Sequence, residues 1–290
     1  MNYRILHRTV YDYSEPVTVS HHAARLKPRS LAHQQRLEFA SRITPEPAVR
    51  KVRRDYFGNG VCFFSIQELH QRFEVVAESL VSVTETTPPA AALSPPWEQV
   101  VTLFSDPVSP TVAEPYQFVF DSPGARAMQE LADYAQKSFS PGTPLLLAVA
   151  DLNRRIHADF TYDPVATTVT TPLEEVIAQR RGVCQDFAHL AIASMRSVGL
   201  PARYVSGYLR TRPQAGKERL IGADASHAWF SAFCPDLGWV DFDPTNNLQP
   251  ASEHITVAYG RDFGDVSPVS GILTGGGEHV VKVSVDVAPA

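Results

Sequence analysis

The hydrophobic pattern changes its period once along this chain, and a segment dense in proline marks the change. Before it, apolar residues alternate with mostly polar ones, as over 3–11, which is the pattern of a half-buried strand. The segment itself carries Pro88-Pro89 and Pro95-Pro96, and proline fixes φ and lacks an N–H. After it, apolar residues recur at helical spacing and strand-like runs follow. We therefore predict an α+β chain with an all-β domain over 1–86, a linker over 87–97 and a mixed domain over 98–290.

Shorter patterns predict individual elements on both sides of the linker. Asn59-Gly60 tolerates positive φ and predicts a hairpin turn between strands over 49–56 and 61–66. A fragment that begins at Trp97 is expected to fold alone, because the linker marks a domain boundary. The other expected elements are helices from Pro123 through Phe139, over 144–158, from a capping box at 171–174 and from Cys184 to Gly199, and strands over 202–209, 227–234, 239–243 and 279–287.

The charge balance excludes one class of partner. The chain has 26 basic and 31 acidic residues among 290, a formal net charge of -5. This balance gives no long-range attraction for nucleic acid or for an anionic membrane, so neither is expected as a partner. A local basic run, Arg50-Lys51-Val52-Arg53-Arg54, is interpreted as a solvated strand face, with an anion or partner site as the alternative.

The composition also indicates in which cellular compartment the protein is expected. Hydrophobic residues make up 44% and charged residues 20% of the chain, which is typical of a globular protein. No run of apolar residues is long enough for a transmembrane helix, and the first residues lack the apolar core of a secretory signal. Three cysteines (Cys62, Cys184 and Cys234) do not form a disulfide framework. We therefore expect a cytoplasmic protein.

Cys184 is the first candidate for chemistry, because it stands at the predicted start of a helix. The partial positive charge and unpaired N–H groups of a helix N-terminus favour an anionic thiolate. Gly182 allows another backbone to approach the sulfur. The alternative is a small core residue, which is the usual role of a lone cysteine.

A thiolate nucleophile needs a base and a group that orients the base. His227 lies in one predicted strand, and Asp241 and Asp243 lie in the next, after the tight turn Pro235-Asp236-Leu237-Gly238. The two strands should be antiparallel neighbours, so the histidine can meet a carboxylate. Asp241 and Asp243 share one face of their strand, so the period does not choose between them.

The remaining candidates are interpreted as structural: a packed helix residue (His189), capping or turn residues (Asp186, Asp224), a buried tyrosine rather than an oxyanion donor (Tyr162) and a strand residue facing away from the histidine (Cys234). His189 follows Cys184 by five helical steps, which places the two side chains about 140° apart. No zinc, calcium or nucleotide-binding motif occurs, so no metal and no cofactor are expected.

Three ordered blocks stand out in the second domain: Gly182-Val183-Cys184-Gln185-Asp186-Phe187-Ala188-His189, Ser226-His227-Ala228-Trp229 and Gly238-Trp239-Val240-Asp241-Phe242-Asp243-Pro244-Thr245-Asn246. Together they resemble the motifs of the transglutaminase-like superfamily, in particular its bacterial branch with an N-terminal β-domain. The catalytic resemblance covers about 144–247 and the β-domain resemblance about 1–86. It implies Cys184, His227 and Asp243 as catalytic residues, which selects Asp243 over Asp241. It also implies a papain-like core, a cysteine-bearing helix against an antiparallel sheet, in 98–290.

The resemblance implies a cysteine-dependent acyl-transfer enzyme that acts on a carboxamide or peptide bond through a thioester. Hydrolysis, as by a protease or amidase, is expected over crosslinking, because water surrounds the protein. A protein or peptide is the expected substrate. The alternative is a non-catalytic binding or assembly module that keeps the fold. The presence of all three catalytic residue types favours the enzyme.

Overall fold

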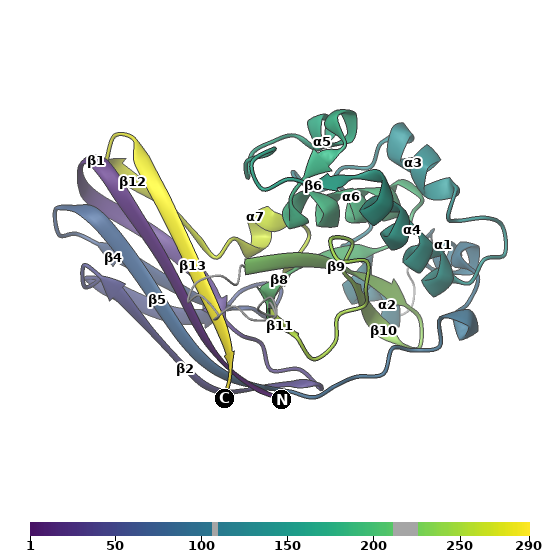
Figure 1. Ribbon diagram of the computed structural model, residues 1–290, viewed down its shortest axis with the longest axis horizontal. Helices are drawn as coiled ribbons and strands as arrows, with labels where there is room; N and C mark the ends of the chain where they lie inside the picture. The colour runs from purple at the N-terminus through teal and green to yellow at the C-terminus, as the bar shows by residue number, and fades with distance from the viewer. Residues whose placement is uncertain (106–109, 211–225) are drawn as a thin grey trace, which may run out of the picture.

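A computed structural model of the protein describes residues 1–105, 110–210 and 226–290. A long, curled antiparallel sheet stands beside a region of helices packed on a second sheet (Figure 1). The first sheet consists of β1 (Asn2–Lys27), β2 (Gln34–Thr44), β3 (Val49–Arg54), β4 (Gly60–Ile66), β5 (His70–Val83), β12 (Val269–Gly275) and β13 (His279–Pro289). The expected α+β class with an all-β N-terminal region is confirmed.

Strand β1 organises the first sheet because it is long enough to pair with four other strands. Along one edge it pairs with β5 and then with β4. Along the other edge it pairs with β13 and then with β12. Tyr3, Ile5 and His7 are buried between exposed neighbours, as the alternating pattern predicts.

The last two strands lie in this N-terminal sheet, although the sequence pattern placed them with the second domain. Tyr3 pairs with Pro289 and Tyr13 with His279, so the two ends of the chain lie side by side (Figure 1). The pairing covers an edge of β1 that would otherwise expose unpaired N–H and C=O groups. A strand pattern in a sequence does not name its partner, so this placement could not be foreseen. The division of the chain into domains stays a prediction.

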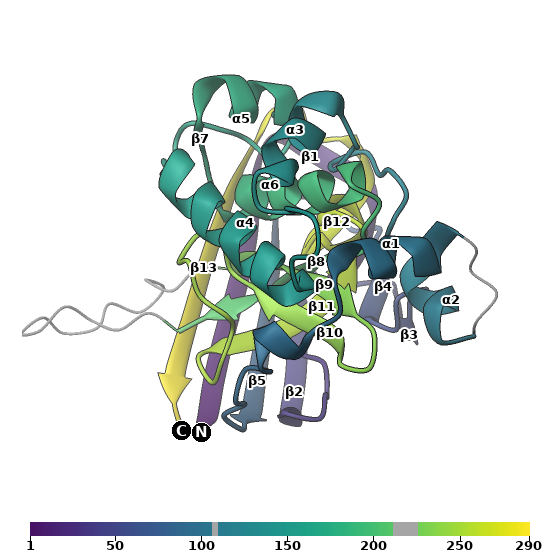
Figure 2. The same cartoon turned by 90° about the vertical axis from the view of Figure 1, so that its right-hand side faces the viewer.

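The second region places α3, α4, α5 and α6 on one face of a four-stranded antiparallel sheet (Figures 1 and 2). The sheet has the order β10-β9-β8-β11 and consists of β8 (Ala202–Leu209), β9 (Ser226–Cys234), β10 (Gly238–Phe242) and β11 (His254–Gly260). The helices are α1 (Trp97–Ser105), α2 (Pro110–Tyr116), α3 (Gln129–Gln136), α4 (Leu145–Asp159), α5 (Leu173–Gln179), α6 (Cys184–Ser197) and α7 (Phe263–Val266). A short turn of 3-10 helix (Ala91–Leu93) and a parallel pair, β6 (Thr161–Tyr162) and β7 (Arg181–Gly182), complete the elements. Helix α6 packs against β8 and β9, as expected for a papain-like core.

Two of the predicted helix starts differ from the structure. The helix expected after Pro123 begins only at Gln129, because the Asp121 carboxylate accepts the N–H of Ala127 at 2.8 Å and holds the intervening residues in a loop. The capping box expected at 171–174 does not form. Helix α5 begins at Leu173, and the hydroxyl of Thr171 accepts the N–H of Thr168 instead.

The hairpin expected at residue 59 forms between β3 and β4, but its turn differs. Gly58 takes the positive φ, 76°, whereas Gly60 already begins β4. Asn59 is completely buried, and its side chain bonds the backbone of Tyr259: Nδ2 donates to O at 2.7 Å and Oδ1 accepts from N at 2.8 Å. Gln34 bonds the backbone of Thr256 in the same way, at 2.8 Å in both directions. These two amides fasten the outer edge of β11 to the first sheet.

One hydrophobic core spans both regions. Tyr3 and Ile5 of β1, and Val285 and Val287 of β13, belong to the same buried cluster as the apolar faces of α4 and α6. The first sheet therefore supplies core to the second region, and burial of this apolar surface stabilises the two together.

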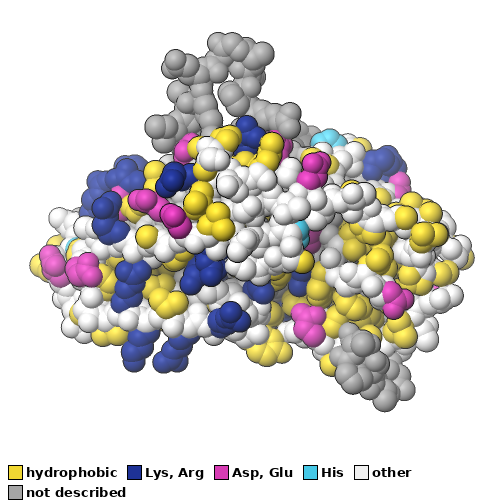
Figure 3. All heavy atoms as spheres, turned by 90° about the horizontal axis from the view of Figure 1, so that it is seen from below, with side chains coloured by type: hydrophobic (Ala, Val, Ile, Leu, Met, Phe, Trp, Pro, Cys, Tyr) yellow, Lys and Arg dark blue, Asp and Glu magenta, His cyan; other side chains and the backbone are white. Residues whose placement is uncertain are grey.

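The surface bears on two further expectations. Every residue of the basic strand β3 is exposed, in agreement with a solvated strand face. Figure 3 shows Lys and Arg side chains gathered on the half of the lower face that lies under the first sheet. Within the described ranges, no helix combines the length and the apolar character needed to cross a lipid bilayer. The cytoplasmic location stays a prediction.

Candidate active site

Cys184 is the first residue of α6, where the sequence placed a helix start. Val183 before it is extended, with φ of -110° and ψ of 179°. The Asp186 carboxylate accepts the N–H of Val183 at 2.8 Å and the hydroxyl of Thr167 at 2.6 Å, which fixes the first turn and confirms the capping role expected for Asp186. A Cβ at Gly182 would lie 2.7 Å from the Asp186 Oδ2 atom, so this position requires glycine.

The start of α6 has the electrostatics that a thiolate needs. The first N–H groups of a helix have no partner within the helix, and the macrodipole places partial positive charge there. The Cys184 side chain is half-buried. It opens into a cavity of about 570 Å³ that it shares with His227. The nucleophile candidate is thus accessible to a substrate.

His227 and Asp243 form a buried pair beside this cavity. His227 Nε2 lies 2.8 Å from Asp243 Oδ2, and the two side chains are 8% and 0% exposed. The other carboxylate oxygen accepts the backbone N–H groups of Thr245 and Asn246, at 2.9 and 3.2 Å. The Asn246 Nδ2 atom also donates to Oδ2 at 2.7 Å. The carboxylate is therefore held rigidly towards the imidazole.

The pair is charged at neutral pH. Burial by itself lowers the pKa of His227, but hydrogen bonds and attraction to Asp243 and Cys184 outweigh burial and raise it to about 10. Burial also opposes ionisation of Asp243, but hydrogen bonds from His227, His254 and Asn246 hold the pKa of this carboxyl well below its usual range. An ionised carboxylate only accepts, so His227 donates from Nε2 to Asp243, which leaves Nδ1 as the ring nitrogen available for proton transfer.

Asp241 occupies a different place from Asp243, although the period of the strand did not separate them. Asp241 Oδ2 accepts the indole N–H of Trp229 at 3.1 Å, and Oδ1 accepts the hydroxyl of Ser231. Strand β10 ends at Phe242, and the turn that follows directs the side chain of Asp243 towards His227. The structure thus brings together Cys184, His227 and Asp243, and leaves Asp241 to anchor β9.

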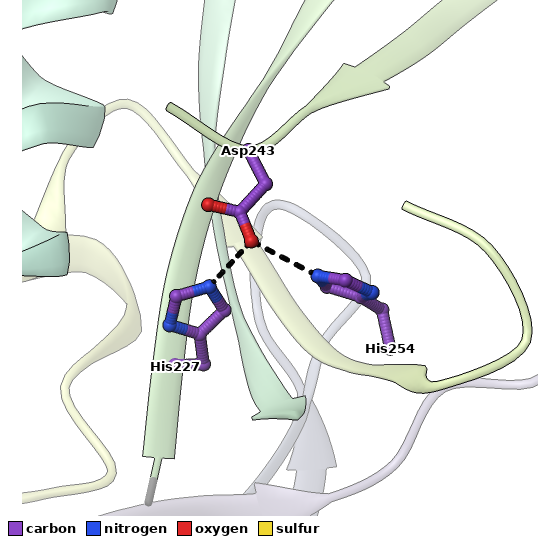
Figure 4. Close-up of side chains that lie close together, drawn as sticks. All are labelled: His227, Asp243 and His254. Carbon is purple, nitrogen blue, oxygen red and sulfur yellow. Dashed lines mark hydrogen bonds and ion pairs between the residues drawn. The ribbon is translucent and has the colours of Figure 1, made fainter. Parts of the chain in front are cut away.

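A second histidine, which the sequence did not reveal, contacts the same carboxylate oxygen. His254 Nε2 lies 3.1 Å from Asp243 Oδ2, on the other side from His227 (Figure 4). His254 begins β11, is 5% exposed and packs edge-on against the Trp229 ring at 5.2 Å between centroids. No motif surrounds this histidine, so only the pairing of β11 with β8 reveals its position.

His227, Asp243 and His254 are also spaced as a group that could surround a metal ion, since their ligand atoms lie within 4.8 Å of one another (Figure 4). Both histidines and Asn246 already donate to the shared oxygen. A metal ion would displace these hydrogen bonds and detach His227 from Asp243. The absence of a metal requirement stays a prediction.

His189 and Cys234 have the structural roles expected of them. His189 Nε2 accepts the N–H of Phe263 at 3.0 Å, and burial lowers the pKa of His189 to about 4, so the ring is neutral. Cys234 is fully buried in the core, where burial and the charge of Asp236 raise its pKa to about 11. Neither residue faces the cavity that contains Cys184.

The interpretation of Tyr162 as a buried residue is wrong. Its side chain is 52% exposed, because β6 pairs with Gly182 at the surface. Partial burial and the charge of Cys184 raise the pKa of Tyr162. Asp224 lies outside the described residues.

Two family models match the chain. The bacterial transglutaminase-like N-terminal region matches residues 3–82, and the transglutaminase-like superfamily matches residues 132–244, the part that contains Cys184, His227 and Asp243. The chain belongs to the transglutaminase-like superfamily. This confirms the resemblance of the three sequence blocks.

Individual relatives match the chain to different extents. An uncharacterized protein of Mycobacterium tuberculosis is 40% identical over 295 residues, which cover 99% of this chain and 92% of that protein. The protein-glutamine gamma-glutamyltransferase of Pseudomonas aeruginosa is 33% identical over 133 residues, which cover 44% of this chain and 19% of that protein. A solved candidate cysteine protease from Cytophaga hutchinsonii shares the fold, with a TM-score of 0.76, 22% identity and coverage of 99% of this chain and 90% of its own.

Proposed function

We propose that this transglutaminase-like protein is a cysteine-dependent acyl-transfer enzyme that cleaves a carboxamide or peptide bond. Cys184 is the nucleophile, His227 carries the proton, and Asp243 orients the imidazole and supports its charge. The supporting observation is the cavity that Cys184, at the start of α6, shares with His227, whose imidazole is hydrogen-bonded to the buried Asp243. The membership of the superfamily agrees with this assignment.

The first half-reaction forms a thioester. The Cys184 sulfur, which has given its proton to His227, attacks the carbonyl carbon, and the carbonyl electrons move to the oxygen. The backbone N–H of Cys184 at the start of α6 is the proposed donor to this oxyanion, an interaction worth about 3–4 kcal/mol in comparable sites. His227 then gives its proton to the departing nitrogen, the C–N bond breaks, and an amine leaves.

The second half-reaction releases the acyl group. His227 takes a proton from water, and the water oxygen attacks the thioester carbon. The C–S bond breaks, the sulfur regains its starting state and a carboxylic acid leaves. An amine in place of water would give a new amide. Hydrolysis is favoured here because water is the acceptor in excess, although the names of relatives include both a candidate protease and a glutamyltransferase.

The test is trapping of the acyl group in cell lysate. Wild-type protein and Cys184→Ala are incubated with lysate peptides, with and without a fluorescent primary amine, and acylated Cys184 is sought by mass spectrometry. We expect a thioester and acid products from wild type and neither from Cys184→Ala. Turnover retained by Cys184→Ala would overturn the nucleophile assignment. Amide products in preference to acids would make the enzyme a transglutaminase.

The same experiment addresses the non-catalytic binding module. A module of that kind binds peptides without acylation, so wild type and Cys184→Ala would retain the same peptides and Cys184 would stay unmodified. The buried charged pair argues for the enzyme, because a binding protein gains nothing from an imidazolium held beside a thiol.

A further inference from the structure

The cavity at Cys184 has a wall made by the two ends of the chain. Helix α6 and strand β9 supply Cys184 and His227. The other wall is formed by alternate residues of two paired strands: His7, Thr9 and Tyr11 of β1, and His279, Val281 and Val283 of β13. Thr9 pairs with Val283 and Tyr11 with Val281, so these side chains share one face of the first sheet.

This wall is lined by histidine, threonine, tyrosine and valine side chains. Among the described residues that line the cavity, none is Asp, Glu, Lys or Arg. His7 is 1% exposed and hydrogen-bonded to the hydroxyls of Tyr208 at 3.0 Å and Thr9 at 2.9 Å. Burial lowers the pKa of His7 to about 4, so this ring is neutral at pH 7.

Apolar surface on the wall remains uncovered. Val281 and Val283 are 43% and 53% exposed, although both point into the cavity that contains Cys184. Val269 and Pro268, at the start of β12, continue the apolar lining. The volume of about 570 Å³ falls within the range of about 300–1,000 Å³ that holds small organic ligands.

We infer that the first sheet is the specificity wall of the enzyme, and that it selects acyl donors with an uncharged, apolar side chain next to the bond that Cys184 attacks. Binding is favoured when an apolar group packs against Val281 and Val283, because apolar surface is then removed from water. A charged side chain would lose hydration against a wall with no Asp, Glu, Lys or Arg among its described residues, and the imidazole of His227 across the cavity is already paired with Asp243. This inference rests on the proposed function, since it takes the cavity at Cys184 as the donor site.

Strand β13 contains its own control for this inference. Val280 is 57% exposed, close to the value for Val283, but it points to the opposite face of the strand and does not line the cavity. Isolated exposed valines are common on protein surfaces. Only a valine that faces the cavity should therefore affect which molecules reach Cys184.

The test compares two electrophiles that differ only in charge. N-benzylchloroacetamide and its 4-carboxybenzyl analogue alkylate the full-length protein, and peptide mass spectrometry gives the rate at Cys184 apart from Cys62 and Cys234. The ratio of the two rates is divided by the same ratio for free N-acetylcysteine. We expect this corrected ratio, the neutral rate over the carboxylate rate, to be about ten, a discrimination typical of apolar pockets. A corrected ratio near one would overturn the inference.

Two lysine variants locate the effect. Val283→Lys should remove the preference for the neutral reagent and favour the carboxylate, whereas the matched control Val280→Lys should keep the wild-type ratio. Equal changes of the rate ratio in both variants would assign the effect to general surface charge and would overturn the inference that this wall selects the substrate. Circular dichroism confirms that each variant is folded.

Unsubstituted iodoacetamide distinguishes failure of the inference from failure of the proposed function. It has no side chain for the wall to select. If Cys184 reacts with it at pH 7 no faster than N-acetylcysteine does, the nucleophile assignment fails. The ratio of the two benzyl reagents, measured at pH 9 where any thiol reacts, still tests the wall.

Discussion

His254 Nε2 lies 3.1 Å from Asp243 Oδ2, so a single carboxylate oxygen holds two buried histidines. The other histidine, His227, shares that oxygen at 2.8 Å and is the one that lines the cavity with Cys184. His254 thus holds the carboxylate from the side of β11, together with the hydrogen bonds from Thr245 and Asn246, whereas the proposed proton transfer takes place on the side of β9. His254 is a positioning residue for Asp243.

Removal of this hydrogen bond should weaken catalysis without weakening binding. We expect His254→Ala to lower kcat by about tenfold, since a hydrogen bond to a charged group contributes about 1.5–3 kcal/mol, and to leave KM unchanged. His254→Gln should restore most of kcat, because its amide can donate to Asp243. Steady-state kinetics on a donor found by acyl trapping provides the measurement. A glutamine variant as slow as the alanine variant would reduce His254 to a packing role.

The two aspartates should respond differently to the same substitution. Asp243→Asn should lower kcat by up to about 10⁴-fold, as loss of the orienting carboxylate does in related triads, and should move alkylation of Cys184 to higher pH. Asp241→Asn is the matched control, since Asp241 contacts Trp229 and Ser231 rather than His227. The reverse outcome, with Asp241→Asn inactive and Asp243→Asn active, would contradict the assignment.

Stability should depend on pH through the same pair. The pKa of His227 is raised from 6.5 to about 10, so its stabilising effect is complete below pH 6.5 and is lost as the pH rises through 10. The pKa of Asp243 is lowered, so its effect is complete above its ordinary value of 3.8 and is lost as the pH falls below it. The Tm difference between wild type and Asp243→Asn should be greatest near pH 5 and narrow towards pH 10. Calorimetry between pH 5 and pH 10 measures this Tm difference. A difference that does not change with pH would contradict a stabilising interaction between His227 and Asp243.

Asn59 should contribute to stability far from the catalytic residues. Asn59→Ala removes both hydrogen bonds to the Tyr259 backbone at a site without water access, and we expect a loss of about 1–3 kcal/mol in the free energy of unfolding. Asn2→Ala is the control, because the side chain of Asn2 is exposed. Urea unfolding compares the two, and equal losses would argue against the amide as a fastening between the sheets.

The fragment from Trp97 onward should not fold alone, contrary to the expectation from the proline-rich linker. It retains β12 and β13 but lacks β1, with which both strands pair. It also lacks Tyr3 and Ile5 of the shared core. We expect aggregation of 97–290 by light scattering and recovery of soluble material on co-expression with 1–96. A monomeric, cooperatively unfolding fragment would show that the second region needs no strand from the first.

Local features of the fold were readable from the sequence, and long-range ones were not. The start of α6 at Cys184 follows from the local pattern, and β8 has the predicted bounds, because periodicity and helix ends depend on neighbouring residues. The partner of β13 lies more than 260 positions away along the chain, and no period encodes it. The choice of Asp243 over Asp241 required the superfamily resemblance, because it depends on where β10 ends.

The pairing of β1 with β13 also sets the order in which the molecule can be completed. A growing chain makes β1 first and releases its last partner only after residue 289 has left the ribosome. Until then one edge of β1 is open, and the thiol of Cys184 has no apolar wall opposite it. Pairings of such high contact order form late and slowly. The cavity at Cys184 therefore acquires its valine-lined side only when β1 and β13 have paired, among the slowest contacts of the fold to form.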